Sequence, residues 1–418
     1  MPFRISSRVP RRPRLWIAAW LALSAFALVS CSALTNITGG PKPPQAPTPS
    51  QTAPPALQPT QPTAPAAASP ATPASAPSGP PRVALLLPLS GPSAQLGTAM
   101  LNAAQMALFD QPDSGVTLLP RDTGGAPDGA AAAARDAIQQ GARIIVGPLL
   151  AGEVEAVKPI AAAANVPVLA FSNSMAVAGG GVFLLGFQPQ QEVARVVQYA
   201  ISKGHQRFAV LAPDSPYGNL AVDALKAAVG AASGASVVRV ANYDPDTTDL
   251  TPIVQSFAQN ADFDALLLPE GGTRLRLLVP LLPYDGIDPD TVKFLGTGLW
   301  DVPGLGVEPA LAGGWYAAPT PAARAGFESR YRALYNRAPP RLATLPYDAV
   351  SLVVTLMHDG GDLSLAALTN PNGFAGIDGI FRLLPNGIAQ RGLAVLQVER
   401  GQPTVIDPAP TDFRNLGE

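Results

Sequence analysis

The chain has 418 residues, enough for two or three lobes of ordinary size, and 47 % of them are hydrophobic against only 14 % charged. Its 28 Lys and Arg are balanced by 30 Asp and Glu, which argues against a nucleic-acid partner because phosphate binding depends on clustered cations. One cysteine excludes a disulfide framework and a thiolate metal cage. The two histidines lie far apart without an acidic partner at metal-ligand spacing, so the sequence predicts neither a metal site nor a cofactor.

Residues 1–30 have the pattern of an export signal. Five arginines and no acidic residue occupy 1–14, and the apolar run 15–29 is shorter than the roughly 20 residues of a membrane-spanning helix. The run ends in Leu-Val-Ser-Cys, with Cys31 last, and resembles the bacterial lipoprotein signal. We therefore expect 1–30 to be removed as a lipoprotein signal peptide and Cys31 to be lipidated, which would anchor the chain to a membrane. The alternative is an ordinary secretory signal with an accidental cysteine.

Residues 31–81 predict a disordered tether that begins at the lipidated cysteine. The stretch contains 15 prolines, one charged residue (Lys42) and no aromatic residue. Such a composition cannot bury enough apolar surface to fold, and its prolines favour extended polyproline geometry. Fully extended, it would reach on the order of 150 Å.

From Arg82 onward, short apolar runs alternate with helical spacing of apolar residues. A first series predicts strands at 83–89, 116–119, 143–149 and 166–171, with helices at 93–110, 127–141 and 152–165, and it ends after 181–187. A second series predicts helices at 190–203, 217–232, 250–260 and 273–282, with strands at 207–212, 236–243, 263–269 and 293–296. Apolar strands that alternate with helices indicate parallel sheets covered on both faces. The fold class is therefore α/β, with two doubly wound lobes.

The remaining sequence predicts how the lobes are connected. Two long helices, 322–336 and 346–359, are expected against the first sheet. A hairpin-like pair, 379–384 and 392–399, is expected on the second, so the chain would cross between the lobes three times. The predicted boundaries are 82–188 plus 318–370 for lobe 1, 189–317 plus 371–402 for lobe 2, and 403–418 for a tail.

Several short motifs resemble the type I periplasmic binding fold, in its leucine/isoleucine/valine-binding branch. They are the sequence Leu-Pro-Leu-Ser-Gly-Pro-Ser-Ala-Gln-Leu-Gly at 87–97, Gly147-Pro148, Tyr217-Gly218 after a strand, and the segment 379–387 with its Pro-Asn-Gly turn. Within that branch the chain is most similar to the lipoproteins described as penicillin-binding protein activators. In those, Ser-Gly-Pro, Val-Gly-Pro-Leu and Gly-Thr-Gly-Leu-Trp recur, here at 90–92, 146–149 and 296–300.

The resemblance implies a ligand cleft between the lobes, at the carboxyl ends of the strands. The loop at 172–174 and Tyr217 match positions at which amino-acid-binding relatives make contact. Other positions depart from the pattern: the turn 149–152 has no hydroxyl, and Gly298 stands where relatives place the acid that binds the ammonium group. Glu270 is either a substitute carboxylate or a solvated loop acid. The candidate cleft residues are Ser90, Ser93, Leu96, Ala151, Ser172, Ser174, Tyr217, Glu270 and Gly298.

Catalysis finds little support in the sequence, and we predict no catalytic residue. Ser90 and Ser93 lie in a strand-to-helix loop, but Gly-x-Ser-x-Gly is absent, no histidine is near, and Ser93 is most simply a helix cap. A dinucleotide-like start at 296–298 lacks its third glycine.

The resemblance therefore favours a non-enzymatic regulator, an activator, of a peptidoglycan synthase or penicillin-binding protein. It would be periplasmic and lipid-anchored, and Ser32 after the lipidated cysteine suggests the outer membrane. The alternative is the substrate-binding subunit of an ABC importer for branched-chain amino acids or a related small solute, which would dock on a permease. An amino-acid ligand is doubtful because a buried ammonium group without a counter-charge is costly.

Overall fold

The computed structural model describes residues 80–358 and 360–414, which belong to one compact unit, residues 73–418. The predicted signal peptide, Cys31 and nearly all of the tether lie outside the described residues. None of the helices within those residues combines the length and the apolar character that crossing a bilayer requires.

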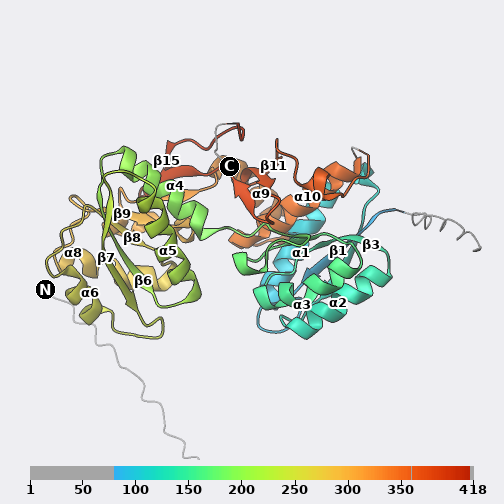
Figure 1. Ribbon diagram of the computed structural model, residues 1–418, viewed down its shortest axis with the longest axis horizontal. Helices are drawn as coiled ribbons and strands as arrows, with labels where there is room; N and C mark the ends of the chain where they lie inside the picture. Colours follow the sequence, from blue (N-terminus) through green and yellow to red (C-terminus); the bar gives the residue numbers. More distant parts are fainter. Residues whose placement is uncertain (1–79, 359, 415–418) are drawn as a thin grey trace, which may run out of the picture. The chain divides into compact units, whose positions relative to one another are not determined.

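The first lobe is built on a five-stranded parallel sheet with the order β2-β1-β3-β4-β5 (Figure 1). Its strands are β1 (Arg82–Leu87), β2 (Thr117–Asp122), β3 (Ala142–Val146), β4 (Val168–Ala170) and β5 (Val182–Leu184). Successive side chains of β1 alternate between two cores, with Leu85 in one and Leu86 in the other, because side chains along a strand point to opposite faces. The apolar run that predicted this strand is thus buried on both faces.

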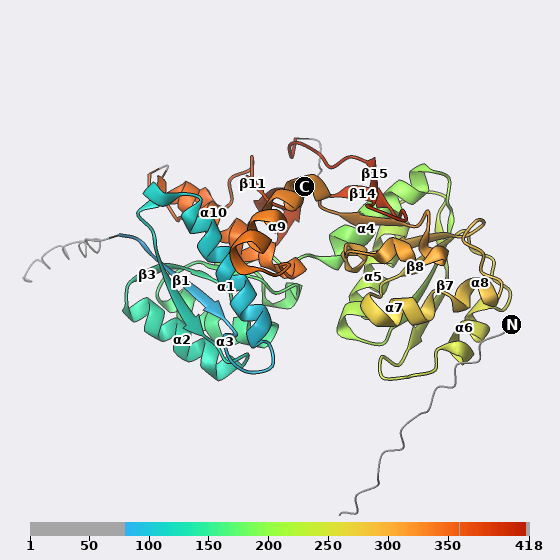
Figure 2. The ribbon, with the colours of Figure 1, turned by 180° about the vertical axis from the view of Figure 1, so that it is seen from behind.

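Helices cover both faces of this sheet. On one face, α2 (Pro127–Gln139) and α3 (Ala151–Ala163) pack through alanines and valines. On the other face lie α1 (Ala94–Phe109) and α10 (Thr344–His358). A further helix, α9 (Pro321–Tyr335), lies beside α1, where its Phe327 and Tyr331 pack on the alanines of α1 (Figure 2). The short helix α11 (Leu365–Leu368) follows α10.

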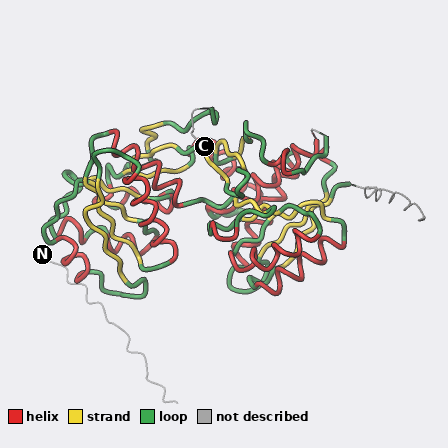
Figure 3. Tube along the Cα trace, viewed as in Figure 1, coloured by secondary structure: helices red, strands yellow, loops and turns green. Residues whose placement is uncertain are grey.

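The second lobe has a seven-stranded sheet with the order β15-β14-β10-β9-β8-β6-β7. Figure 3 shows the strands of both lobes in yellow and the helices in red. The strands of the second sheet are β6 (Arg207–Pro213), β7 (Ser236–Tyr243), β8 (Ala265–Leu268), β9 (Lys293–Gly296), β10 (Trp315–Ala318), β14 (Ala394–Gln397) and β15 (Thr404–Asp407). The strands from β7 to β10 are parallel, whereas β14 and β15 each pair antiparallel. One face is covered by α4 (Pro189–Ser202) and α5 (Pro216–Gly230), and the other by α6 (Thr251–Ala258), α7 (Gly272–Leu278) and α8 (Leu281–Tyr284).

The predicted C-terminal hairpin, 379–384 with 392–399, is wrong. The turn exists, since Gly387 N donates to Leu384 O at 2.9 Å, but β12 (Gly379–Leu383) pairs with β11 (Phe374–Gly376) and β13 (Ala389–Arg391). Strand β14 lies instead between β10 and β15 in the second lobe. The physical reason is burial, because Phe381 and Leu383 of β12 belong to the core of the first lobe.

Two predicted boundaries change accordingly. Residues 374–391, predicted in lobe 2, pack with lobe 1, and β15 takes its place in the second sheet although 403–418 was predicted as a tail. The chain passes between the lobes three times, after β5, after β10 and after β13. Arg391 links the first and third crossings, since its guanidinium donates to Leu185 O at 2.8 Å. The predicted fold class, two doubly wound lobes joined by three crossovers, is confirmed.

Candidate ligand-binding site between the lobes

A cavity of about 740 Å³ lies where the carboxyl ends of the strands of both lobes meet. Apolar side chains make most of its wall: Leu96, Leu149, Leu150, Phe171, Phe187, Leu299, Val302 and Leu342. Six of the nine predicted cleft residues line it: Ser93, Leu96, Ser172, Tyr217, Glu270 and Gly298. The tertiary structure thus brings together residues that are widely separated in the sequence.

The other three predicted residues do not line the cavity. Ser90 lies by Asp122, whose Oδ1 accepts a hydrogen bond from Ser90 N at 3.1 Å. The Ser90 hydroxyl and the neighbouring backbone N–H groups hold the pKa of Asp122 below its usual value. Ala151 is the first residue of α3. Ser174 N donates to Ser172 Oγ at 3.1 Å. Ser93 occupies the N-cap position of α1, as expected, but its side chain forms no capping hydrogen bond.

The N-terminus of α3 is closed by a side chain of its own first turn. Glu153 is 1 % exposed, and its Oε2 accepts a hydrogen bond from Leu150 N at 3.0 Å. A carboxylate at this place satisfies the N–H group and the positive end of the helix dipole that a ligand carboxylate would otherwise use. The turn at 149–152, which has no hydroxyl group, is therefore bound by a carboxyl group of the chain itself, that of Glu153.

Two further polar groups of the cavity are also bound within the chain. The hydroxyl of Tyr217 donates to Thr297 Oγ1 at 2.8 Å, so this tyrosine is held against its own lobe. Burial, together with the nearby carboxyl of Glu192, raises the pKa of Tyr217, and the phenol stays protonated. In the facing loop, Ser172 Oγ is used by Ser174 N. The Tyr217 hydroxyl is thus committed to Thr297, whereas Ser172 accepts a hydrogen bond and its O–H group can still donate.

The functional residue that the sequence analysis missed is Glu192, in the first turn of α4. Its side chain is buried yet lines the cavity, and its Oε2 accepts a hydrogen bond from Gly298 N at 2.8 Å. A Cβ added to Gly298 would lie 2.4 Å from Glu192 Oε1. The carboxyl group therefore occupies the space that a side chain at 298 would fill. The only sequence signal was an acid in a helical first turn, which is common at any helix start.

Glu270 is neither free in solvent nor unpartnered. Its Oε2 accepts from the hydroxyl of Tyr243 at 2.5 Å, and its Oε1 accepts from its neighbour Gly271 N at 2.9 Å. Burial and the bond to Glu270 raise the pKa of Tyr243. Both oxygens are held, so Glu270 lies at the cavity wall with less freedom to bind a ligand than Glu192.

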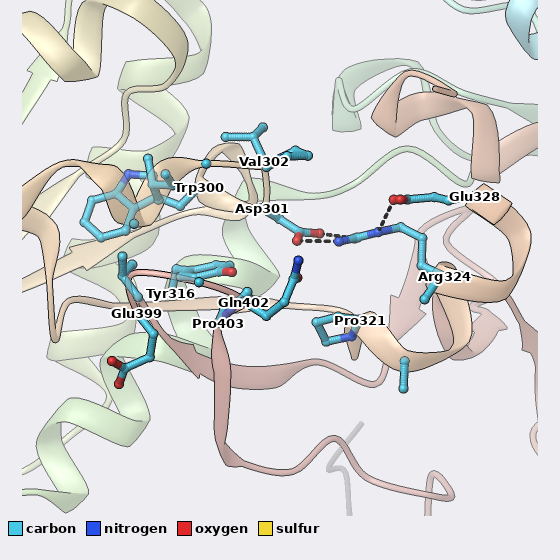
Figure 4. A pocket seen from close by; sticks show the side chains of 18 of the residues that line it. Trp300, Asp301, Val302, Tyr316, Pro321, Arg324, Glu328, Glu399, Gln402 and Pro403 are labelled. Atoms are coloured by element: carbon cyan, nitrogen blue, oxygen red, sulfur yellow. Dashed lines mark hydrogen bonds and ion pairs between the residues drawn. The ribbon is translucent and has the colours of Figure 1, made fainter. Parts of the chain in front are cut away.

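A buried ion cluster closes one side of the cavity. Asp301 follows β9 and is 3 % exposed at its side chain, and both of its oxygens are bound by Arg324 of α9, as Figure 4 shows. Arg341 donates to the same carboxylate at 3.0 Å and pairs with the buried Asp378 at 2.9 Å. Asp301 belongs to the second lobe and both arginines to the first, so this cluster connects the lobes. Both guanidinium groups are paired with carboxylates.

A second cavity, of about 510 Å³, shares Asp301 and Val302 with the first in its lining (Figure 4). Trp300 and Tyr316 line one side of it, and Pro321, Arg324 and Glu328 line the other. Arg324 donates to Glu328 at 3.2 Å as well as to Asp301, so its guanidinium group is already paired with two carboxyl groups of the protein. We assign no ligand to this cavity.

The comparison with known proteins identifies the fold family. The family described as periplasmic binding protein matches residues 80–403, which is most of the chain. The chain belongs to the periplasmic binding protein family. The predicted resemblance to the type I fold and its leucine-binding branch is thereby confirmed, and membership implies a periplasmic location.

Solved structures and curated relatives resemble this periplasmic binding protein to different extents. A putative branched-chain amino acid ABC transporter protein from Rhodospirillum rubrum has a TM-score of 0.69 at 21 % identity, covering 78 % of this chain and 99 % of that one. Penicillin-binding protein activator LpoA from Glaesserella parasuis is 32 % identical over 145 residues, which is 34 % of this chain and 24 % of that protein. An uncharacterized Rickettsia prowazekii protein, RP748, is 23 % identical over 180 residues, 43 % of this chain and 48 % of its own length. The chain thus spans less than half the length of these two relatives.

The contact between Gly298 and Glu192 can be tested in this periplasmic binding protein. Gly298→Ala should lower the free energy of unfolding by about 2 kcal/mol, because overpacking a filled site forces the buried carboxyl group away from its N–H donor. Chemical denaturation measures the loss. The Glu192→Ala background should remove most of it, since the colliding oxygen is then absent. Equal losses in both backgrounds would contradict the contact.

Proposed function

We propose that this periplasmic binding protein is a non-enzymatic, lipid-anchored activator of a peptidoglycan synthase of the penicillin-binding protein class. One observation carries the proposal: backbone N–H groups of the cavity wall that could receive the carboxylate of an amino acid are bound by side chains of the chain itself. Leu150 N is bound by Glu153, Gly298 N by Glu192, and Gly271 N by Glu270. An amino-acid carboxylate entering the cavity would have to break these bonds and leave buried groups without partners, which is costly.

Two further features support an activator. The similarity to LpoA covers 34 % of this chain, whereas the similar solved structure from Rhodospirillum rubrum is described as a transporter. The sequence also predicts a proline-rich tether after a lipidated Cys31, and such a tether would let an outer-membrane-anchored domain reach a synthase across the periplasm. A solute carrier that docks on an adjacent permease has less use for this reach.

The activator proposal is tested by reconstitution. Purified lipidated protein is added to a bifunctional penicillin-binding protein from the same organism with lipid-linked peptidoglycan precursor, and glycan and crosslink formation are measured. We expect the rate to rise several-fold, and crosslinking in native envelopes to recover the synthase. A flat rate together with crosslinks to permease subunits alone would contradict the proposal. The control is the same protein with a chemically denatured binding domain.

The second candidate is the substrate-binding subunit of an ABC importer. The observation in its favour is the cavity of about 740 Å³ between the lobes, within the usual volume of a small-molecule site. A bound ligand raises the melting temperature by mass action. Thermal scans with the twenty amino acids therefore separate the candidates: we expect no shift, whereas a shift of several degrees with leucine or valine would favour the importer.

A further inference from the structure

The cavity between the lobes offers hydrogen-bond acceptors to a ligand and few donors. As described above, the N–H groups of the cavity-lining residues Leu150, Gly271 and Gly298 are each bound by a side chain of the protein. The one cation in the wall, Arg341, is shared between Asp301 and Asp378, and its guanidinium stacks on Phe187 at 4.2 Å from the ring centroid. The neutral side chains of Ser93 and Asn173 also line the cavity and can donate, but among the described lining residues an anionic ligand would find no unpaired positive charge.

Glu192 is the acceptor that remains open. Its side chain is 4 % exposed, it lines the cavity, and one oxygen is held by Gly298 N. Within the described part of the chain, Oε1 receives no hydrogen bond. Since the side chain lines the cavity, this oxygen is available to accept a hydrogen bond from a ligand. Because Oε2 is anchored on the backbone, Oε1 is also fixed in position.

The charges around the cavity add to negative. Glu192, Glu270 and Asp301 line it, against Arg341 alone. Asp301 is already neutralised by two arginines, but neither Glu192 nor Glu270 forms an ion pair within the described residues. Glu270 accepts its two hydrogen bonds from neutral groups, the Tyr243 hydroxyl and the Gly271 N–H. Electrostatic complementarity therefore favours a cation.

The rest of the wall is apolar. Leu96, Leu149 and Leu150 come from the first lobe, and Leu299 and Val302 from the second, so a ligand body held between the lobes would contact aliphatic side chains on both sides. Phe171 adds an aromatic face. Contact with such a surface removes the apolar area of a hydrocarbon body from water, which favours binding.

We propose that the cavity binds a small primary amine with a branched aliphatic or aromatic body and no carboxylate, its ammonium group donating to Glu192 Oε1. The ammonium is the counter-charge that the buried carboxylate lacks, and the hydrocarbon body fills the apolar walls. A zwitterion would have to place its carboxylate in a wall whose described residues offer it no unpaired positive charge. The inference concerns the cavity alone, and it holds whichever macromolecule the protein contacts.

The test uses matched compounds that differ only in their charged groups. Leucine is compared with 3-methylbutylamine, which lacks the carboxylate, and with 4-methylpentanoate, which lacks the amine. Phenylalanine, 2-phenylethylamine and 3-phenylpropanoate form a second set. Titration calorimetry on the purified binding protein at about pH 8 should show the amine of each set binding at least about tenfold tighter than its zwitterion and its acid.

Glu192→Gln is the decisive variant, since its amide oxygen can still accept from Gly298 N while the charge is lost. Amine affinity should fall at least about tenfold. The exposed Glu155→Gln on α3 should leave it unchanged, and a thermal melt confirms that both variants fold. A zwitterion or acid that binds as tightly as its amine, no amine binding at millimolar concentration, or unchanged amine affinity in Glu192→Gln would each overturn the inference. Synthase activation is measured separately, so either proposal can fail alone.

Discussion

Asp301→Asn is expected to lower the free energy of unfolding by about 3 kcal/mol. The Asp301 side chain is 3 % exposed and accepts hydrogen bonds from Arg324 and Arg341, whose side chains are 13 % and 20 % exposed. Breaking a buried pair by removing one charge costs several kcal/mol, because the partner charges stay buried without compensation. Asparagine has nearly the same volume, so the loss reports charge and hydrogen bonding rather than a cavity.

The expected loss is at the lower end of that range because both arginines keep a second partner. Arg324 retains Glu328, and Arg341 retains Asp378 at 2.9 Å. Urea denaturation followed by circular dichroism measures the change. The matched control is Asp262→Asn, whose side chain is 59 % exposed and lies 3.7 Å from Arg207, and it should cost less than about 0.5 kcal/mol. Similar losses for the two variants would show that the Asp301 cluster contributes no more than a surface pair.

The contacts of Asp301 also connect the lobes, since it lies in the second lobe and both arginines lie in the first. Hydrogen exchange should therefore report a local effect as well as a global one. In Asp301→Asn, amides near 298–304 and 341–345 should exchange faster than in the control at the same denaturant concentration. Uniform acceleration throughout the protein would instead indicate a purely global loss of stability.

Glu192→Gln is expected to stabilise the protein at alkaline pH and not at acid pH. Burial raises the pKa of Glu192 from its ordinary 4.5 to about 7, against the opposing effects of the Gly298 N–H, Arg341 and Arg391, while Asp301 raises it further. A carboxyl group whose pKa is higher in the folded state contributes stability that is present below about pH 4.5. That contribution is lost as the pH rises through about 7.

The substitution removes this loss. Between pH 5 and pH 8.5 the stability of Glu192→Gln relative to the unaltered protein should therefore rise by up to about 3 kcal/mol. Other titrating groups are common to both proteins and largely cancel in the difference. Urea denaturation at the two pH values measures it, and Glu155→Gln on the exposed face of α3 should give a difference that does not change with pH. A constant offset for Glu192→Gln would mean that this carboxyl titrates near its ordinary value.

Much of the fold could be predicted because its signals are local. The strands of both lobes are short apolar runs such as 265–268, and the helices between them repeat apolar residues at helical spacing. The prediction for the C-terminal region was wrong for the same reason, because it too relied on local signals. Phe381 and Leu383 are apolar in a pattern that suits either core, and β13 has only three residues before the chain crosses between lobes. The local sequence does not specify which of the two cores buries these side chains.

The site was predictable only in part. Ser172, Tyr217 and Gly298 lie at the carboxyl ends of strands or at the start of helices, where the fold places a ligand, and they do line the cavity. Their hydrogen-bond partners could not be predicted, because Tyr217 and Thr297 are 80 positions apart and Glu192 and Gly298 are 106 apart. The sequence showed that Gly298 lacks a carboxylate, and the structure places one there from another helix.

Composition and periodicity alone determined that this chain is a two-lobed α/β protein, because burial on both faces of a sheet requires apolar strands and covering helices whatever their sequence neighbours are. The chemical character of the cavity was decided only by the tertiary structure. Whether a polar group is open to a ligand depends on the atoms beside it after folding, and these atoms come from remote parts of the chain. Leu150 N and Gly298 N illustrate this, since a carboxyl group of the protein occupies each of them.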